Sequence, residues 1–377
     1  MAAGDRKWVK YNVPMWRVQR QCVIEDKEGY LYLPTRYGAV KVNPGDGATV
    51  WESAADFIPE DINGGALAIT TSGVLVLSGY YNNKNIRGIR ASDGALLWEQ
   101  VLPETFNSEY QLFPAVDYKD RVFYASSKHL TSIDTSTGSI LWQKDLSSIT
   151  SGLSNPIIMG ELNTGKLITN TADGKIRTFN LNTGEEEDID KYQVGVWGAN
   201  LYRMSSKEFL TAATSNEGMR LYNFNTGGNY SQWQHVDLTR NGVPLITKTD
   251  ENGLATEIYS SLSVWSASLG TGVYNTSLPG GYDGYSGSKA MNSDGIVFVR
   301  YKDANGLKIK AVDAKDGYSY LWTTENLNAS REIRSVVLGS EGTLYVLKEE
   351  GIYNFSLYAY DTGSTSGPME EPCGLVG

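Results

Sequence analysis

The chain has 377 residues, a formal net charge of −10 at pH 7 and a sequence pI of about 4.9. An acidic surface repels phosphate groups, so this charge argues against a nucleic-acid partner. No run of about 18 consecutive apolar residues occurs, and the sequence therefore predicts no membrane-spanning helix.

A glycine recurs eight times along the chain at intervals of 43 to 47 residues, each time after a short β-rich run that ends in a turn. A repeat of this length with four strands per unit is typical of a β-propeller. The sequence therefore predicts an all-β fold, in which residues 1–377 form one eight-bladed β-propeller of four-stranded antiparallel blades. The repeat glycines are Gly47, Gly94, Gly138, Gly184, Gly227, Gly272, Gly317 and Gly363.

Each unit has the same order of elements. A first apolar strand ends in a turn, a second strand follows, a third runs to the repeat glycine and a fourth leads away from it, as in a meander of hairpins. The turns after the first strands contain glycine, as at residues 26–29, 71–73 and 340–342. In chain order, second strands are expected at residues 30–33, 74–77, 121–124, 166–169, 208–211, 256–259, 296–299 and 343–347.

Tryptophans follow several of the repeat glycines. Trp51, Trp98 and Trp142 each lie four residues after one, and Trp322 lies five residues after one. The pattern weakens in the fourth unit, where Asp188 stands in the tryptophan position. The motif resembles the tryptophan-docking motif of the quinoprotein (PQQ-type) eight-bladed propellers. This resemblance implies that the indole of one blade stacks on the glycine-bearing turn of its neighbour, where glycine accepts a positive φ and the indole buries about 150–250 Å².

The last unit is incomplete, because Gly363 is followed by neither a tryptophan nor a recognisable fourth strand. We expect the missing strand to come from the N-terminus. Residues Lys7–Tyr11 would pair as the outer strand of the eighth blade, with Trp8 as the docking residue. Such a closure removes an open sheet edge. A frayed N-terminal tail is the alternative.

The resemblance covers the scaffold and not the cofactor. Quinoprotein dehydrogenases of this family carry large insertions, adjacent cysteines over the quinone and a calcium site, whereas this chain has neither the length nor adjacent cysteines. We therefore expect no PQQ and no other cofactor. The chain has two histidines, His129 and His235, and no cysteine cluster, so we expect no metal site either.

The two cysteines, Cys22 and Cys373, lie near opposite ends of the chain, which a closed ring brings together. A disulfide between them would lock the ring and restrict the unfolded chain, and two free thiols are the alternative. A bridge would indicate an oxidising compartment, and four Asn-x-Ser/Thr sequons point weakly in the same direction. We expect a secreted protein or one in the secretory pathway, with a cytoplasmic location as the alternative.

Propeller ligands usually bind at the mouth of the central channel, which is lined by the loops leading into each first strand and by the turns between second and third strands. Three residues there are candidates for catalysis: Arg17, His129 and Tyr285. The candidates for ligand binding combine large rings, amides and arginines: Trp16, Asn63, Tyr110, Gln111, Asn155, Trp197, Asn200, Tyr282, Arg331 and Arg334. Rings suit a flat or apolar ligand, and arginines bind a carboxylate. Alternatively, the rings plug the channel, the arginines pair with nearby acids and His129 is a solvated loop residue.

Two functions fit these features. In size and style the chain resembles compact propellers of fungal natural-product pathways associated with hetero-Diels–Alder cyclisation. That resemblance implies a cofactor-independent enzyme or binder that holds a quinone-methide-type partner and a terpene in a reactive pose. The ligand would be a small apolar or aromatic molecule and the protein a monomer. Alternatively, the length and the eight blades are similar to the propeller lipoprotein of bacterial outer-membrane protein assembly, a non-catalytic scaffold that acts by protein–protein contact.

Overall fold

The computed structural model describes the strands and many of the turns that connect them. Between residues 188 and 275 it describes only the backbone of the strand residues and, of the side chains, that of Leu201. The described residues are 2–15, 23–35, 38–53, 67–78, 85–103, 114–126, 128–148, 153, 157–159, 165–193, 200–203, 208–212, 219–223, 229–233, 245–249, 255–260, 263–266, 271–275, 290–292, 294–303, 306–313, 319–327, 333–351 and 354–367.

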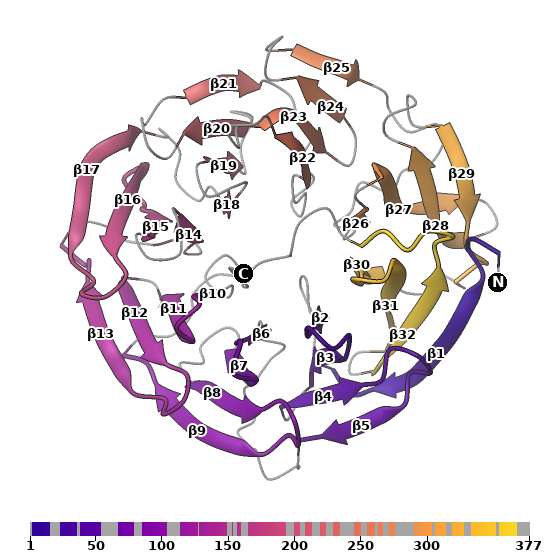
Figure 1. The fold of residues 1–377 in the computed structure, drawn as a ribbon, viewed down its shortest axis with the longest axis horizontal. Helices are drawn as coiled ribbons and strands as arrows, with labels where there is room; N and C mark the ends of the chain where they lie inside the picture. Colours follow the sequence, from indigo (N-terminus) through magenta and orange to yellow (C-terminus); the bar gives the residue numbers. More distant parts are fainter. Residues whose placement is uncertain are drawn as a thin grey trace.

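The described elements are β-strands, and they form eight four-stranded antiparallel sheets. Figure 1 shows the sheets placed one after another around a central axis, as the blades of a propeller are. In seven sheets the four strands are consecutive in sequence, with the first strand nearest the axis and the fourth on the outside. The predicted all-β propeller class is confirmed.

The blades are numbered here in chain order. Blade 1 consists of β2 (Ile24–Glu25), β3 (Leu31–Pro34), β4 (Ala39–Val42) and β5 (Thr49–Glu52), and blade 2 of β6 (Leu67–Ile69), β7 (Val74–Ser78), β8 (Asn85–Arg90) and β9 (Leu96–Val101). Blade 3 consists of β10 (Ala115–Val116), β11 (Arg121–Ala125), β12 (His129–Asp134) and β13 (Ile140–Asp145), and blade 4 of β14 (Ile157–Met159), β15 (Lys166–Asn170), β16 (Lys175–Asn180) and β17 (Glu186–Gln193).

Blade 5 consists of β18 (Asn200–Arg203), β19 (Glu208–Ala212), β20 (Met219–Asn223) and β21 (Asn229–Trp233), and blade 6 of β22 (Leu245–Thr249), β23 (Ala255–Ser260), β24 (Ser263–Ser266) and β25 (Thr271–Asn275). Blade 7 consists of β26 (Ala290–Met291), β27 (Ile296–Asp303), β28 (Gly306–Asp313) and β29 (Ser319–Thr323). Blade 8 joins β30 (Ile333–Leu338), β31 (Thr343–Gly351) and β32 (Asn354–Asp361) to β1 (Arg6–Val13). Every second strand begins within one residue of the position that the sequence predicted.

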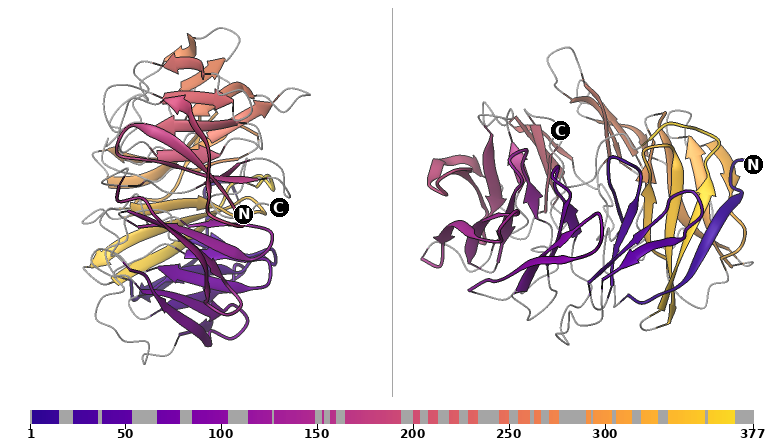
Figure 2. Two further views of the ribbon diagram at one scale, coloured as in Figure 1. Left: turned by 90° about the vertical axis from the view of Figure 1, so that its left-hand side faces the viewer. Right: turned by 60° about the horizontal axis from the view of Figure 1, so that its bottom comes forward.

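Blade 8 is built from both ends of the chain. The outer strand β1 pairs antiparallel with β32, with Trp8 opposite Ala359 and Val9 opposite Tyr358. The side views in Figure 2 show the indigo N-terminal strand lying along the yellow C-terminal strands. The predicted pairing of the N-terminal segment with the last blade is therefore observed, and these residues do not form a frayed tail.

The turn between the third and fourth strands of blade 8 is completed by the N-terminus. Gly4 donates its N–H to the Asp361 carbonyl at 2.7 Å, and Asp361 donates to the Asp5 carbonyl at 2.9 Å. Blade 1 has the same two hydrogen bonds within one continuous turn, in which the Gly47 N–H donates to the Asn43 carbonyl at 2.9 Å. Gly4, with a φ of +90°, thus takes the role in the eighth blade that the repeat had predicted for Gly363.

Tryptophan docking joins blade 7 to blade 8 and continues through blades 1, 2, 3 and 4. Each indole lies on the docking glycine of the next blade, and four indole N–H groups donate to the carbonyl three residues before that glycine. Trp322 lies in the same way on Gly4. The four donor–acceptor pairs are Trp8 to Pro44 at 2.7 Å, Trp51 to Ala91 at 3.0 Å, Trp98 to Thr135 at 2.6 Å and Trp142 to Leu181 at 3.0 Å.

A β-bulge precedes each of these tryptophans. In blade 1, Val42 pairs with Thr49 and Lys41 pairs with Trp51, so Val50 is the extra residue. A bulge increases the local twist and re-aims the following side chain, here toward the neighbouring blade. The extra residues are Lys7, Val50, Leu97, Leu141 and Leu321.

The hydrophobic core lies between the blades. Val40 of blade 1 and Leu347 of blade 8 belong to one buried cluster, and Val76 of blade 2 and Val122 of blade 3 belong to another. A single four-stranded sheet cannot bury its two apolar faces alone, so the cores require neighbouring sheets. Docking at the outer rim therefore acts together with apolar packing nearer the axis.

Substitutions at Gly94 and Gly73 distinguish two reasons why replacing a glycine destabilises the fold: strain of a positive φ and a clash of the new Cβ with a neighbour. Both have a positive φ, but a Cβ on Gly94 would lie 2.7 Å from the Trp51 ring, and one on Gly73 would meet nothing within 4 Å. We expect Gly73→Ala to lower the free energy of unfolding by about 1 kcal/mol through backbone strain. Gly94→Ala should cost about 3 kcal/mol, because the added Cβ also forces Trp51 to move. Urea denaturation measures both, and equal losses would contradict the docking.

Trp8 tests the ring closure. We expect Trp8→Ala to lower the free energy of unfolding by about 3 kcal/mol or more, because it removes a buried indole at the junction of blades 8 and 1. Tyr11→Ala is the matched control on the same strand, since its ring is 58% exposed, and we expect a change within about 0.5 kcal/mol. Both are measured by urea denaturation. A Trp8 effect no larger than the Tyr11 effect would show that docking does not stabilise the closure.

Candidate functional site

Most of the residues predicted to line the channel mouth lie outside the described part of the chain. Asn200 opens β18 and Arg334 lies in β30, and their side chains are not described. The predictions for these residues and for the disulfide stay predictions. The residues outside the description are Trp16, Arg17, Asn63, Tyr110, Gln111, Asn155, Trp197, Tyr282, Tyr285, Arg331, Cys22 and Cys373.

His129 is the predicted catalytic residue whose side chain is described. It opens β12 and pairs with Asp145 on the outermost strand β13, and its Nε2 lies 3.9 Å from an Asp145 carboxylate oxygen. Hydrogen bonds from the Ser147 hydroxyl and backbone, together with the charge of His129, hold the pKa of Asp145 below its ordinary value. The imidazole therefore lies in the outer half of blade 3, and a role at the channel mouth stays a prediction.

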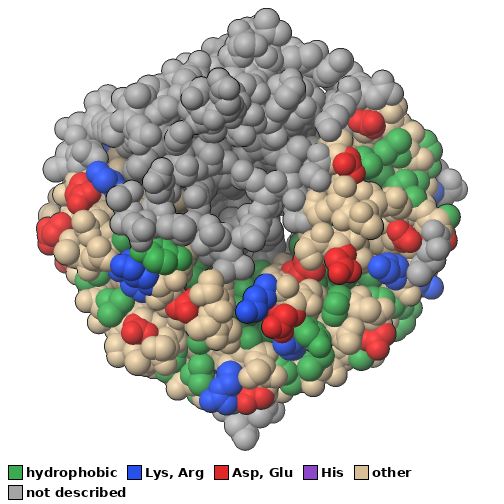
Figure 3. All heavy atoms as spheres, viewed as in Figure 1, with side chains coloured by type: hydrophobic (Ala, Val, Ile, Leu, Met, Phe, Trp, Pro, Cys, Tyr) green, Lys and Arg blue, Asp and Glu red, His purple; other side chains and the backbone are tan. Residues whose placement is uncertain are grey.

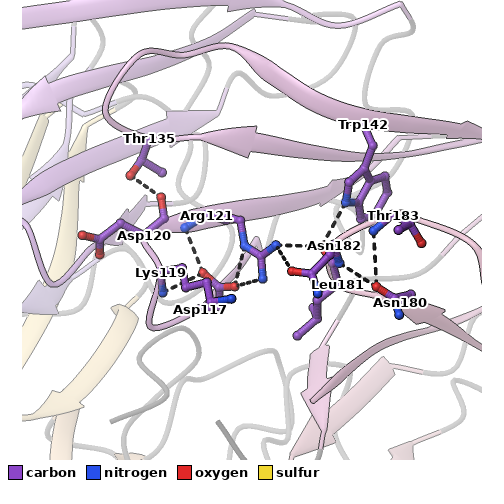
Figure 4. Close-up of polar contacts among 10 residues, drawn as sticks. All are labelled: Asp117, Lys119, Asp120, Arg121, Thr135, Trp142, Asn180, Leu181, Asn182 and Thr183. Atoms are coloured by element: carbon purple, nitrogen blue, oxygen red, sulfur yellow. Dashed lines mark hydrogen bonds and ion pairs between the residues drawn. The ribbon is translucent and has the colours of Figure 1, made fainter. Parts of the chain in front are cut away.

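The junction of blades 3 and 4 contains the polar network drawn in Figure 4. The buried Asp117 carboxylate accepts the backbone N–H groups of Lys119 and Arg121 at 3.0 and 2.9 Å and the Arg121 Nε at 2.7 Å. Arg121 then donates across the junction to the Leu181 carbonyl at 3.0 Å. That carbonyl also accepts the Trp142 indole N–H, so a cation and a tryptophan of blade 3 share one acceptor in blade 4.

The junction of blades 1 and 2 repeats this arrangement with a lysine. Buried Lys41 donates to the Ala91 carbonyl at 3.3 Å, the same carbonyl that accepts the Trp51 indole. Its ammonium lies 3.7 Å from an Asp26 oxygen and 4.1 Å from the centre of the Tyr30 ring. Lys41 and Arg121, each paired with a carboxylate, thus reinforce tryptophan docking at two junctions. The motif within one repeat did not predict this arrangement.

Other buried charges are also paired within the fold. Arg177 contacts Glu186 at 2.6 Å and Asp173 at 2.8 Å, and Lys348 contacts Glu350 at 3.0 Å. Desolvation by burial, together with the charge of Glu350, raises the pKa of Tyr358 to about 12. Among the described residues, no group of three or more His, Cys, Asp or Glu side chains is placed to hold a metal ion. The Arg177 and Lys348 pairs lie within blade 4 and blade 8 respectively.

Exposed apolar side chains gather on the outermost strands. Tyr11 on β1 and Tyr320 on β29 are more than half exposed, at 58% and 56%. Figure 3 shows hydrophobic side chains reaching the outer edge of one face, interspersed with acidic and basic ones. The large apolar residues that are exposed in the described part of the chain are Tyr11, Val50, Leu96, Val101, Ile140, Leu141, Tyr320 and Leu321.

Comparisons with known proteins agree with this architecture. The family model described as "Outer membrane protein assembly factor BamB" matches residues 36–245, which is more than half of the chain. No curated protein sequence matches the chain significantly. No helix in the described residues has the length and apolar character needed to cross a membrane.

Solved propellers share the fold at low sequence identity. The Dos1 propeller has a TM-score of 0.64 at 11% identity over 94% of both chains. The computationally designed Ika8 protein has a TM-score of 0.60 at 13% identity over 97% of this chain and 99% of its own. BamB from Moraxella catarrhalis has a TM-score of 0.58 at 13% identity over 93% of this chain and 100% of its own.

The sheets, the docked tryptophans and these matches define a β-propeller of the PQQ-like superfamily. More specifically, the chain belongs to the family described as outer membrane protein assembly factor BamB. The predicted PQQ-like superfamily is confirmed, and the matches give no support to the predicted likeness to natural-product cyclases.

Substitution of Arg121 measures how much its buried pair with Asp117 contributes to the stability of the fold. We expect Arg121→Ala to lower the free energy of unfolding by about 3 kcal/mol, because it leaves the Asp117 carboxylate buried without its charge partner. Arg90→Ala is the control, since the Arg90–Asp93 pair is about half exposed on both sides and, being screened by solvent, should contribute much less than the buried pair. Urea denaturation compares the two. Equal effects would contradict a stabilising role for the buried pair.

Proposed function

We propose that this protein is a non-catalytic scaffold that binds partner proteins through its outer surface. The family's description as an assembly factor supports this proposal, because assembly factors act on other proteins. The chain would then function by presenting a stable ring of strands to which partner proteins bind.

One observation of the structure carries the proposal. The large apolar side chains exposed in the described residues all lie on outermost strands, namely β1, β5, β9, β13 and β29. Exposed apolar side chains that recur over neighbouring elements are typical of protein interaction surfaces. A small-molecule enzyme would need its apolar groups in a concave site instead.

A cyclase at the channel mouth stays a prediction from the sequence. Of the residues proposed for it, the side chain that is described is that of His129, whose Nε2 lies 3.9 Å from an Asp145 oxygen on the outermost strand. A monomeric state, secretion and the Cys22–Cys373 bridge are likewise predictions that depend on residues or properties not described. The scaffold proposal requires none of them.

The test is to find out whether the full-length chain binds proteins or small molecules. The tagged chain is isolated from its source after crosslinking, and its most abundant protein partner is identified and purified separately. We expect the two purified proteins to form a stoichiometric complex in size-exclusion chromatography with light scattering. In parallel, a thermal-shift screen uses aromatic natural products and terpenes, and we expect no increase in Tm.

Two outcomes would overturn the proposal. A dose-dependent increase in Tm with an aromatic compound, combined with failure to reconstitute any protein complex, would favour the enzyme or binder at the channel mouth. A complex that dissociates on dilution to micromolar concentrations and forms equally well with unrelated proteins would show non-specific adhesion.

A further inference from the structure

We propose that one arc of the outer rim binds an extended partner segment with acidic residues at one end, aliphatic or aromatic residues in the middle and Lys or Arg at the other. This rests on the proposed scaffold function and specifies its binding site. The arc, called here the rim strip, runs over the outer strands of blades 8, 1, 2, 3 and 4, which follow one another along the circumference in Figure 1. Its main members are Lys7 at one end, the apolar residues Val50, Leu96, Ile140 and Leu141 in the middle, and Glu185 at the other end.

The middle of the rim strip is apolar. Val50, Leu96 and Leu141 are 47%, 41% and 48% exposed, and they lie just after the docking glycine of blades 1, 2 and 3 respectively. The Trp51 indole, which follows Val50, lies on Gly94 of the next blade. Gly94 is two residues before Leu96, so docking brings the backbone next to Val50 close to the backbone next to Leu96. Exposed apolar side chains therefore recur on the outer strands of three successive blades.

The two ends of the rim strip carry opposite charges. In blade 8 the corresponding positions are Arg6 and Lys7, both exposed. In blade 4 the corresponding residues Glu186 and Glu187 already pair with Arg177 and Lys166 at 2.6 and 3.1 Å. The exposed carboxylate at this end is therefore that of Glu185, the preceding residue, whose side chain is 72% exposed. The strip thus carries cations at one end, apolar residues in the middle and the exposed Glu185 carboxylate at the other end.

Local partners neutralise these ends only in part. Arg6 lies 2.9 Å from Glu325, and Lys7 donates to Thr343, yet both cations remain exposed at the rim. Lys144 lies 3.3 Å from Glu185, whose carboxylate nevertheless faces solvent. Complementary charges on a partner can therefore reach both ends and would fix its direction along the strip.

The convex shape of the rim favours an extended peptide segment as the binding partner. Figure 1 shows the outer strands on the convex circumference of the ring, where a flat protein surface can meet only one or two blades. Only a chain that follows the curvature can contact blades 8 to 4 together. The bulges at Val50, Leu97 and Leu141 interrupt the outer strands, so this segment would bind mainly through side chains and not as an added β-strand.

The probe for this proposal is a fluorescein-labelled synthetic peptide with a block of Glu residues, a block of alternating Leu and Ser, and a block of Lys residues. Two matched probes replace the Lys block by Glu, or the Glu block by Lys. Fluorescence anisotropy with the full-length protein measures binding. We expect the bipolar probe to bind about fivefold more tightly than either single-sign probe, and added salt should remove this preference.

Leu141 and Leu321 provide a matched pair of variants. Both are the extra residue of a bulge directly before a docked tryptophan, and they are 48% and 42% exposed, but Leu321 lies on blade 7, outside the rim strip. We expect Leu141→Asp to weaken binding of the bipolar probe at least about tenfold and Leu321→Asp less than about twofold. Urea denaturation of both variants verifies that the fold is retained, and if Leu141→Asp unfolds the chain, Leu141→Ser replaces it.

Charge reversal tests the two ends. Lys7→Glu and Glu185→Lys should each abolish the preference for the bipolar probe, whereas Lys119→Glu, an exposed position on a turn of blade 3, should leave it unchanged. Equal weakening by Leu141→Asp and Leu321→Asp, or equal affinity for all three probes, would overturn the rim-strip proposal. If the natural complex still forms with Leu141→Asp, the scaffold function stands and its binding site lies elsewhere.

Discussion

The contact between a tryptophan indole and the glycine turn of the next blade is the interaction on which the structure depends. The indole ring occupies the space where a Cβ would be, and its N–H donates to a carbonyl three residues earlier in the same turn. Glycine is needed both for the positive φ and for the close approach. Each contact joins two sheets that have no hydrogen bonds between their strands, so it determines how one blade is oriented against the next at the rim.

Two other features of the rim follow from this contact. A bulge turns each tryptophan toward its neighbour, and as a consequence the preceding residue, such as Val50 or Leu141, projects toward solvent. Buried cations such as Lys41 and Arg121 donate to the carbonyl that already accepts the indole. The polar side chains that the fold buries there support docking, while the exposed positions beside each tryptophan are free to differ between blades and to carry recognition.

This division separates the parts of the molecule that can be substituted from those that cannot. At the five junctions from blade 7 round to blade 4 where docking is described, the glycine and the tryptophan must match, because a mismatch leaves a gap or a clash in a tightly packed contact. The residues at the bulges contact solvent and change from Lys7 in blade 8 to Val50 in blade 1 without disturbing the docking. A ring of similar blades can in this way present a sequence of different chemical groups around its circumference.

The sequence by itself determined the repeat, the all-β propeller class, the second strands and the role of Trp8, because each depends on local periodicity, turn chemistry and a glycine-to-tryptophan spacing within one unit. Tertiary structure alone decided that Gly4 is the docking glycine of blade 8, because its turn is assembled from the two chain ends. It also decided that Arg121 reaches Leu181, 60 residues away. Such contacts depend on which turns the ring brings together, and the predicted channel-mouth residues, most of which lie outside the described residues, depend on tertiary placement in the same way.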